Sequence, residues 1–427
     1  MADPRIIARV HASVLEVDAN AWNALLAQEQ HATPFMRHEY LAALERSDSA
    51  TPRTGWAARF ISLWDGQSLI GACPLYLKSH SYGEYVFDWA WASAYEQHGV
   101  PYYPKAVIAV PFTPVPGARL LARDAAARTL LVEAARQYCL DEDISSLHIL
   151  FASEQDQQAS AQAELMPRHT VQFHWQNQRN AKAEPQAANT AASKYSSFDD
   201  FLGQLTQEKR KKIRQERRRV AEAGVTFRWS RGRDISTADW DFFYRCYERT
   251  YLEHGNPPYL TRAFFTEMEQ HLPEAWVLFV AERNGRPIAS SLIAVRALST
   301  GGGTQKHSKD APTPQAEEAI AYGRYWGALE RVDCLHFEAC YYQPIAWCIE
   351  HGISRFEGGA QGEHKMARAL LPVQATSAHW LAHPAFADAV ERFLDREGEG
   401  VEQYLQSLQQ RSPLRSSKAP IQPDPEA

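Results

Sequence analysis

A ten-residue segment near the end of the chain gathers the residue types that handle protons and negative charge. Residues 356–365 read Phe-Glu-Gly-Gly-Ala-Gln-Gly-Glu-His-Lys. The ammonium of Lys365 is a compact hydrogen-bond donor. His364 could act as a base, because an unperturbed histidine titrates at about pH 6.5, and Glu357 could orient the lysine or hold an amine. The alternative is structural, with Lys365 paired to Glu363 or Glu357 at the surface.

The remaining glycines and polar residues of this segment are candidate substrate contacts. Glycine allows a backbone to approach a ligand closely, although the same residues also suit a plain tight turn. These candidates are Gly358, Gly359, Gln361, Gly362, Glu363 and Arg368.

The densest charge run of the chain lies at residues 207–219, with eight basic and two acidic residues. Thr206 could cap a helix here and Gly224 could end it. Ile213 and Val220 would form one packing stripe, so the rest of the surface is basic. The run is either a solvated helix face or a platform for a polyanion such as RNA or a nucleotide-linked sugar. Its candidate ligands are Lys209, Arg210, Lys211 and Arg214.

Composition restricts the class of protein. Of 427 residues, 45% are hydrophobic and 22% charged, so a largely disordered chain is excluded. The net charge of −6 excludes a histone-like protein. No apolar run approaches the roughly 18 residues that span a bilayer, and the first residues lack the apolar stretch of a signal peptide. We therefore expect a cytoplasmic protein without a transmembrane segment.

Other chemistries find no support. The six cysteines include no Cys-x-x-Cys pair, and Cys334, His336 and Cys340 lack the spacing of a metal site. The sequence contains no GxSxG, GxxxxGK[ST] or HExxH motif. We expect no metal and no tightly bound cofactor, and the sequence makes no prediction of oligomeric state.

The elements that must position these residues follow the same order in both halves of the chain. Asp65-Gly66 and Asn284-Gly285 each separate two alternating runs, which is a strong hairpin signal. The strands expected in the first half are 6–14, 59–64, 69–77, 84–91, 106–110, 147–151 and 170–175, with helices at 18–26, 37–46, 125–139 and 155–165. The second half predicts strands at 225–229, 276–282, 287–295, 322–329, 355–357 and 376–381, and helices at 240–251, 262–271 and 337–350, the last ended by Gly352.

The matching order suggests an internal duplication. Gly66 lies 16 positions before Tyr82-Gly83-Glu84-Tyr85, and Gly285 lies 37 positions before Tyr322-Gly323-Arg324-Tyr325. The two spacings differ by 21, the length of the Gly/Pro-rich loop 299–319. Low-complexity composition also predicts a flexible linker at 176–195 and a disordered tail at 413–427.

These patterns resemble the GNAT acyltransferase fold in tandem. The basic helix 208–219 and the segment 356–365 resemble the FemAB-like branch, in which an acidic residue follows an aromatic and precedes Gly-Asp/Glu and Lys. The whole chain also resembles a bacterial family described as peptidoglycan biosynthesis/recognition proteins. The resemblance implies an α/β (α+β) fold with two GNAT-like domains, 1–175 and 196–412, each a mixed, mostly antiparallel sheet flanked by helices.

The resemblance also implies roles for residues. In Fem-type chemistry a lysine at the position of Lys365 polarises the donor carbonyl as charge develops on its oxygen. A strand and the helix after it flank the cleft of this fold, although core packing is the ordinary reading of their rings. Their candidate substrate-binding residues are Tyr322, Tyr325, Trp326, Tyr341, Tyr342 and Gln343.

A phosphate loop is expected in the first half and not in the second. The start of the helix at 337 lacks the acetyl-CoA loop pattern. The loop 111–119 occupies the place of that loop in the first half, so Gly117 and Arg119 are candidate cofactor ligands. A Pro-rich loop at a strand end is the alternative.

The function suggested is acyl or aminoacyl transfer to an amine of a cell-envelope precursor, with aminoacyl-tRNA or acyl-CoA as co-substrate. Two alternatives remain: an acetyl-CoA-dependent N-acetyltransferase that uses the first half, and a non-catalytic module that binds an anionic glycan or lipid-linked precursor.

Overall fold

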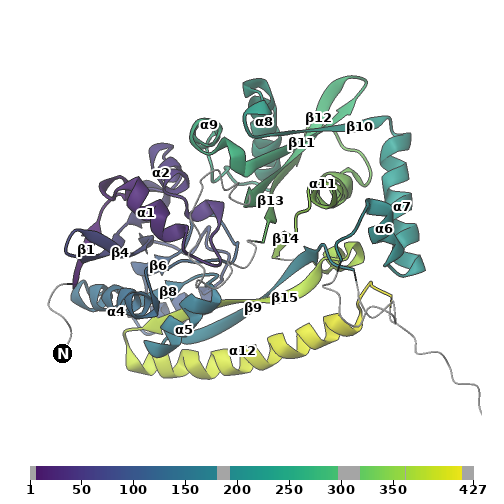
Figure 1. The fold of residues 1–427 in the computed structure, drawn as a ribbon. Helices are drawn as coiled ribbons and strands as arrows, with labels where there is room; N and C mark the ends of the chain where they lie inside the picture. Colours follow the sequence, from purple (N-terminus) through teal and green to yellow (C-terminus); the bar gives the residue numbers. More distant parts are fainter. Residues whose placement is uncertain (1–5, 180–192, 297–317, 361, 416–427) are drawn as a thin grey trace, which may run out of the picture. The chain divides into compact units, whose positions relative to one another are not determined.

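The computed structural model describes residues 6–179, 193–296, 318–360 and 362–415. The chain forms two compact units, and neither is one continuous stretch (Figure 1). Unit 1 takes residues up to 172, 231–276 and 373–406, and unit 2 takes 173–230, 277–372 and the residues from 407. The compact units therefore differ from the two sequence halves. The duplication and the boundary at 176–195 stay predictions, and residues 180–192 lie outside the described residues.

Unit 1 contains an antiparallel sheet in the order β1 (Ile6–His11), β3 (Phe60–Asp65), β4 (Ser68–Cys73) and β7 (Leu121–Ala122). The predicted Asp65-Gly66 hairpin joins β3 and β4. Gly66 has a φ of +60°, a conformation that glycine adopts at little cost.

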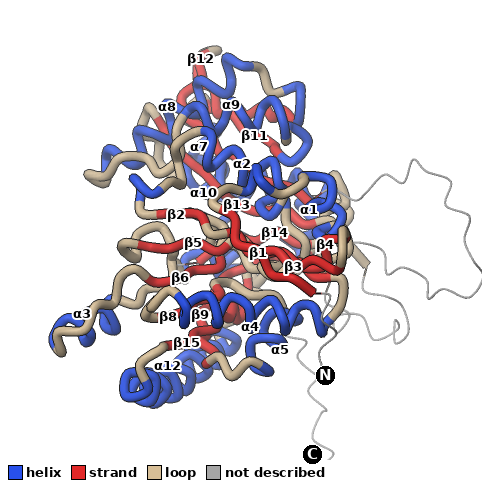
Figure 2. Tube along the Cα trace, turned by 90° about the vertical axis from the view of Figure 1, so that its left-hand side faces the viewer, coloured by secondary structure: helices blue, strands red, loops and turns tan. Residues whose placement is uncertain are grey.

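A second set of strands in unit 1 runs in the order β9 (Met166–Gln176), β15 (Leu371–Leu381), β8 (Ser146–Ile149), β6 (Lys105–Ile108), β5 (Leu75–Lys78) and β2 (Trp56–Ala58). Here β6 and β8 are parallel, whereas β15–β8, β5–β6 and β2–β5 are antiparallel. Figure 2 shows β2, β5 and β6 side by side, with α3 (Trp89–Gln97) standing apart from them. The division between the units falls within β9 and β15.

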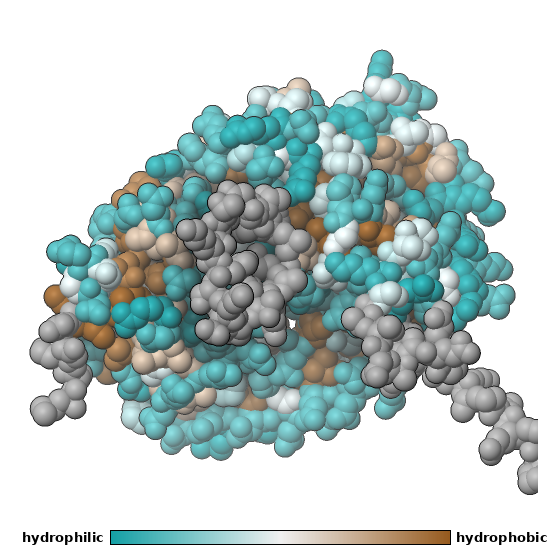
Figure 3. Space-filling model, in the orientation of Figure 1, coloured by the Kyte–Doolittle hydropathy of each residue, from teal (hydrophilic) through white to brown (hydrophobic). Residues whose placement is uncertain are grey.

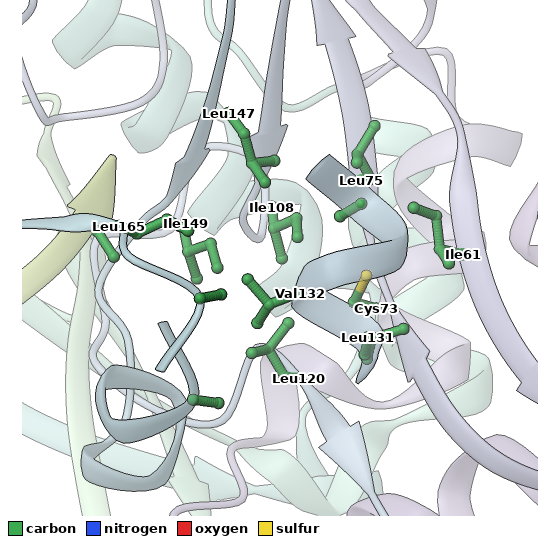
Figure 4. Packing of buried hydrophobic residues seen from close by; sticks show 14 of the residues in the cluster. Ile61, Cys73, Leu75, Ile108, Leu120, Leu131, Val132, Leu147, Ile149 and Leu165 are labelled. Atoms are coloured by element: carbon green, nitrogen blue, oxygen red, sulfur yellow. The ribbon is translucent and has the colours of Figure 1, made fainter. Parts of the chain in front are cut away.

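The helices of unit 1 cover these strands. Figure 4 shows Leu131 and Val132 of α4 among core side chains such as Ile61 and Ile108, all of them buried. In Figure 1, α12 runs alongside β9 and β15. The helices are α1 (Ala19–Leu26), α2 (His38–Arg46), α3 (Trp89–Gln97), α4 (Ala125–Asp141), α5 (Glu154–Gln162), α8 (Thr237–Glu253), α9 (Arg262–His271) and α12 (Pro384–Gln410), whose last four residues belong to unit 2.

Unit 2 is built on strands in the order β10 (Val225–Arg231), β11 (Trp276–Arg283), β12 (Arg286–Arg296), β13 (Ile320–Ala328) and β14 (Arg355–Ala360). Asn284-Gly285 forms the predicted hairpin turn between β11 and β12. The helical segments are α6 (Phe198–Gly203), α7 (Gln207–Glu222), α10 (Leu335–Phe337), the π-helix η7 (Glu338–Tyr342), α11 (Gln343–Glu350) and the 3-10 helix η8 (Glu363–Arg368).

The mixed α+β class is confirmed, with sheets that are mostly antiparallel. The elements differ from the sequence prediction at residues 84–97 and at 384–410. The strand predicted at 84–91 is wrong: residues 84–88 are irregular and α3 begins at Trp89. The longest helix, α12, was not anticipated. The predicted loop 299–319 lies outside the described residues up to 317, as do the tail residues 416–427.

Candidate functional site

A pocket of about 150 Å³ opens in unit 2 beside the point where two parallel strands part. Strands β13 and β14 pair from Ile320–Arg355 to Tyr322–Glu357, and β13 then continues to Ala328 beside β12 without β14. We call this the site pocket. It is lined by Ser291, Leu292, Ile293, Gly323, Arg324, Tyr325, Trp326, His336, Cys340, Tyr341, Phe356, Gly358 and Lys365.

The sequence enforces this local geometry at two glycines. A Cβ on Gly323 would lie 3.1 Å from Cζ of Phe356, so the ring packs against the bare backbone. A Cβ on Gly358 would lie 2.2 Å from the Leu370 side chain and 3.0 Å from a backbone oxygen. On the other side, the β12–β13 register shifts between Leu292 and Ile293, which bends the strand beside the pocket. The short distances from a Cβ at position 358 show that packing requires glycine there.

Lys365 lies in the site pocket together with Tyr325 and is only 6% exposed. Its Nζ donates to the carbonyl oxygens of Gly358 at 2.7 Å and Gly359 at 3.4 Å. Burial lowers the pKa of Lys365 to about 8. The ammonium form therefore still predominates at neutral pH, in surroundings where a charge acts more strongly than in water.

His364 lies next to the pocket and is largely exposed. Its Nε2 is 3.2 Å from the hydroxyl of Tyr341, a pocket-lining residue. Partial burial, followed by the charges of Arg368 and Lys365, lowers the pKa of His364 below its usual value. The imidazole is consequently neutral at pH 7 and able to accept a proton.

Glu357 is buried beneath the pocket and does not line it. Arg355 donates to its Oε1 at 3.1 Å, whereas its Oε2 has no hydrogen-bond partner among the described residues. Burial raises the pKa of Glu357 to about 7, against the opposing effect of Arg355. The Glu357 carboxyl lies on β14 outside the lining of the site pocket, so a substrate bound in the pocket would not touch it.

Arg368 is also buried, and its guanidinium bonds within the protein. Its Nη2 donates to both carboxylate oxygens of Glu216, at 3.1 and 2.9 Å, and the guanidinium lies 3.5 Å from the ring centre of Phe337. Tyr342 donates its hydroxyl hydrogen bond to the same Glu216. These contacts give Arg368 and Tyr342 structural partners where the sequence suggested substrate contacts.

At the start of the helical segment after β13, three backbone N–H groups already have hydrogen-bond acceptors within the protein. The N–H of Leu335 donates to Val332 at 3.2 Å, and those of Phe337 and Glu338 donate to Cys334 at 3.0 and 3.1 Å. The carboxylate of Glu338 accepts from Arg217 and Gln343. A negative side chain with satisfied N–H groups around it makes a poor pyrophosphate site.

The π-helix η7 places Cys340 and Tyr341 on the pocket wall. Single π turns inside longer helices occur frequently at functional sites. Ser291 of β12 donates to the carbonyl of Ala339 at 2.5 Å, which fixes the π turn against the strand.

The basic run forms α7 as predicted, with Thr206 as N-cap residue but without a side-chain cap bond, and Gly224 just beyond its end. A hollow of about 650 Å³ lies on its outer face, lined by Gln207, Arg210, Lys211, Arg214, Gln215 and Arg218. We call it the α7 groove. Figure 3 shows a mainly hydrophilic surface where α7 lies in Figure 1. Arg214 approaches Asp199 at 3.5 Å with both side chains exposed, and the half-buried Lys209 pairs with the exposed Glu208.

At the phosphate loop expected in unit 1, neighbouring groups of the protein pack closely around Gly117 and Arg119. A Cβ on Gly117 would lie 2.6 Å from the Thr33 side chain, so packing requires this glycine. Arg119 is 1% exposed, and its guanidinium donates to the carbonyls of Leu150, Gly117 and Val115. The guanidinium is thus engaged by backbone carbonyls in this structure, and the phosphate-binding role of Gly117 and Arg119 stays a prediction.

The structure thus brings some candidates together and separates others. The site pocket contains Tyr325, Trp326, Tyr341, Gly358 and Lys365. The candidates outside it are Tyr322, Tyr342, Gln343, Glu357, Gly359, Glu363, His364 and Arg368, while Gln361 lies outside the described residues.

Sequence reasoning missed Gly323, Arg324, His336 and Cys340 on the pocket wall. It also missed Glu216, which a helical stripe could have revealed. Glu216 is an acidic residue three positions after Ile213 and four before Val220, within a strongly basic run.

The part of the chain that the structure describes offers neither a metal centre nor a membrane-spanning helix. No group of three or more His, Cys, Asp and Glu side chains there is arranged to hold a metal ion. None of the helices there has both the length and the apolar character needed to cross a membrane.

Comparison with known proteins decides the family. Residues 13–416 match the FemAB-like family, described as peptidoglycan biosynthesis/recognition. The chain belongs to the FemAB-like family. No match was found for this FemAB-like chain among curated protein sequences.

The FemAB-like chain is also similar to several solved structures. The match to a FemX crystal structure covers 90% of this chain and 100% of the FemX chain, with 11% sequence identity and a TM-score of 0.49. For the C-terminal domain of a putative lysylphosphatidylglycerol synthetase from Agrobacterium fabrum the coverages are 88% and 94%, the identity 10% and the TM-score 0.49. The match to a tandem GNAT protein from the clavulanic acid biosynthesis pathway covers 89% of this chain and 99% of that one, with 13% sequence identity and a TM-score of 0.41.

Proposed function

We propose that this FemAB-like protein transfers an acyl or aminoacyl group to an amine, with the reacting carbonyl bound in the site pocket. One observation carries the proposal: the ammonium of Lys365 lies buried in a pocket lined by the rings of Tyr325, Trp326 and Tyr341. A positioned cation in such a place suits an oxyanion that forms during acyl transfer.

In the proposed reaction, the acceptor nitrogen attacks the carbonyl carbon of the donor and a C–N bond forms. The carbonyl oxygen becomes an oxyanion beside Lys365, and the bond from carbon to the leaving oxygen or sulfur breaks when the carbonyl re-forms. The nitrogen loses one proton and the leaving group gains one. His364, neutral at pH 7, is suited to accept the proton from the nitrogen.

We infer that the donor is an aminoacyl ester of tRNA and the acceptor an amine of a peptidoglycan precursor. The family description, peptidoglycan biosynthesis/recognition, supports the choice of acceptor. Three observations support this donor over acyl-CoA. The N–H groups of Leu335, Phe337 and Glu338 at the helix start are bonded within the protein, the guanidinium of Arg119 is bonded internally, and the α7 groove carries four basic side chains. The cytoplasmic location stays a prediction.

The test is a turnover assay with Lys365→Met. Purified protein is incubated with a mixture of charged tRNAs and a muropeptide nucleotide, and aminoacylated product is followed by mass spectrometry. Loss of one oxyanion donor lowers turnover by about 10²–10³, while substrate binding should change little. Lys194→Met removes an exposed lysine of unit 2 that bonds to Gly352, and this control should retain the wild-type rate.

Two outcomes decide between the alternatives. If acetyl-CoA serves as donor and charged tRNA does not, the protein is an N-acetyltransferase. If no donor reacts and Lys365→Met changes only precursor affinity, the protein is a binding module.

A further inference from the structure

Helix α7 has two faces with different partners. The outer face carries the basic side chains of the α7 groove, including Arg210, Lys211 and Arg214. The inner face buries Ile213, Glu216 and Val220. Glu216 is 7% exposed, so a carboxylate has been removed from water on a helix whose other charges are mostly exposed.

The buried carboxylate joins α7 to the segment that carries Lys365. Arg368, at the end of η8, donates to both oxygens of Glu216, and Tyr342 of η7 donates to the same carboxylate. The ring of Phe337 covers the guanidinium at 3.5 Å. Such a bidentate pair fixes orientation as well as distance.

The same guanidinium also holds the backbone of η8. Its Nη1 donates to the carbonyl of His364 at 2.6 Å, directly before Lys365, and the N–H of Leu370 donates to the carbonyl of Lys365 at 3.3 Å. Arg368 therefore contacts α7 at one end and the turn bearing Lys365 at the other. A buried ion pair is a weak source of stability, because desolvation offsets much of the attraction. A positioning role therefore explains this ion pair better than a stabilising role does.

We propose that Glu216 is a positioning residue that couples the occupancy of the α7 groove by phosphate groups to the placement of Lys365. An anion that orders α7 thereby orders η8 through the Glu216–Arg368 pair. The inference deepens the proposed function, since it gives the pocket lysine a link to the anionic part of a substrate, but its test does not require turnover.

The test is hydrogen exchange of the full-length protein with and without two anionic probes. Inorganic pyrophosphate represents a diphosphate group, and deacylated bulk tRNA represents a nucleic acid. In the wild type, at least one probe should slow exchange in α7 and also in residues 363–370, the latter by about fivefold or more, the low end of couplings between sites. The probe that acts identifies the source of the phosphates.

Glu216→Asp keeps the charge but shortens the side chain by one methylene. It should leave the protection of α7 by the probe intact and abolish that of 363–370. Glu222→Asp, the same change at an exposed position of α7, should behave as the wild type. Where turnover is measurable, Glu216→Asp should lower kcat by about 10²-fold with KM held, the effect of an error of about 1 Å in position.

Several results would overturn the inference. They are no protection of α7 by either probe, no response of 363–370 in the wild type, or an equal response in Glu216→Asp. If Glu216→Asp fails to fold by thermal unfolding, Arg368→Lys replaces it, because lysine cannot contact both oxygens and the His364 carbonyl at once. Loss of turnover in Lys365→Met with intact coupling, or the reverse, separates this inference from the proposed function.

Discussion

At the scale of single residues, Lys365 combines a buried position with a charge that survives at neutral pH. Its Nζ is bonded to Gly358 and Gly359, while burial disfavours the ammonium and brings its pKa to about 8. The protein thus tolerates the cost of a buried charge at one point of unit 2. This is common at functional sites, where perturbed groups face a cleft.

A pH prediction follows for Lys365. If the ammonium is the active form, kcat should fall as the pH rises through about 8. Stability should change in the opposite direction, because between about pH 8 and 10.5 the unfolded chain binds more protons than the folded one, so the free energy of unfolding rises with pH. Lys365→Arg keeps its charge and should lose the alkaline fall in kcat. An unchanged fall in that variant would assign the titration to another group.

Individual side chains also show what sequence reasoning could reach. The pocket positions of Tyr325, Trp326 and Lys365 were predictable because a family motif and a strand–helix order located them. Arg119 has the chemistry of a phosphate ligand, but its Nε donates to the carbonyl of Leu150, 31 residues away, a contact that no local pattern reveals. The role of Glu216 depends on Arg368, 152 residues away, so no local pattern could supply it.

At the scale of elements, α7 concentrates positive charge in a chain whose net charge is −6. Its outer face is hydrophilic and hollowed, and its inner stripe packs in unit 2. We expect the charge-reversed triple variant Arg210→Glu, Lys211→Glu and Arg214→Glu to fold normally but to bind deacylated tRNA weakly. Removing three phosphate contacts should flatten the log–log dependence of affinity on salt by about 2–3.

The control reverses three exposed arginines of unit 1, with Arg53→Glu, Arg392→Glu and Arg396→Glu in one protein. Binding isotherms across a salt series compare the two variants. Equal losses of affinity would mean that overall charge attracts the tRNA and that α7 has no special part in it.

The hairpins were predictable because a turn dipeptide and alternating flanks are local signals. Helix α12 was not, since Gly398 and Gly400 lie inside it and weaken its helical pattern. Its contacts offset that propensity: Arg168 donates to both carboxylate oxygens of Glu397 at 2.8 Å. The strand predicted at 84–91 failed because aromatic residues are strand formers by preference, yet Trp89–Gln97 packs as a helix.

At the scale of the whole molecule, the chain passes several times from one compact unit to the other. Unit 1 takes α8, α9, most of β15 and most of α12 from residues after 230. We therefore expect a fragment of residues 1–175, the N-terminal domain suggested by the sequence, to lack a cooperative unfolding transition. Circular dichroism and thermal unfolding, with the full chain as control, test this. A stably folded fragment would favour two autonomous GNAT-like domains.

The order in which the strands are translated has a consequence for folding on the ribosome. Ile149 of β8 pairs with Ala378 of β15, so the partner strand is translated 229 residues later. At about 5–20 residues per second, the wait is about 10–50 s. For that time one side of β8 stays open and part of the apolar core around Leu147 and Ile149 lacks its cover. We therefore expect nascent chains to bind chaperones that recognise exposed apolar segments.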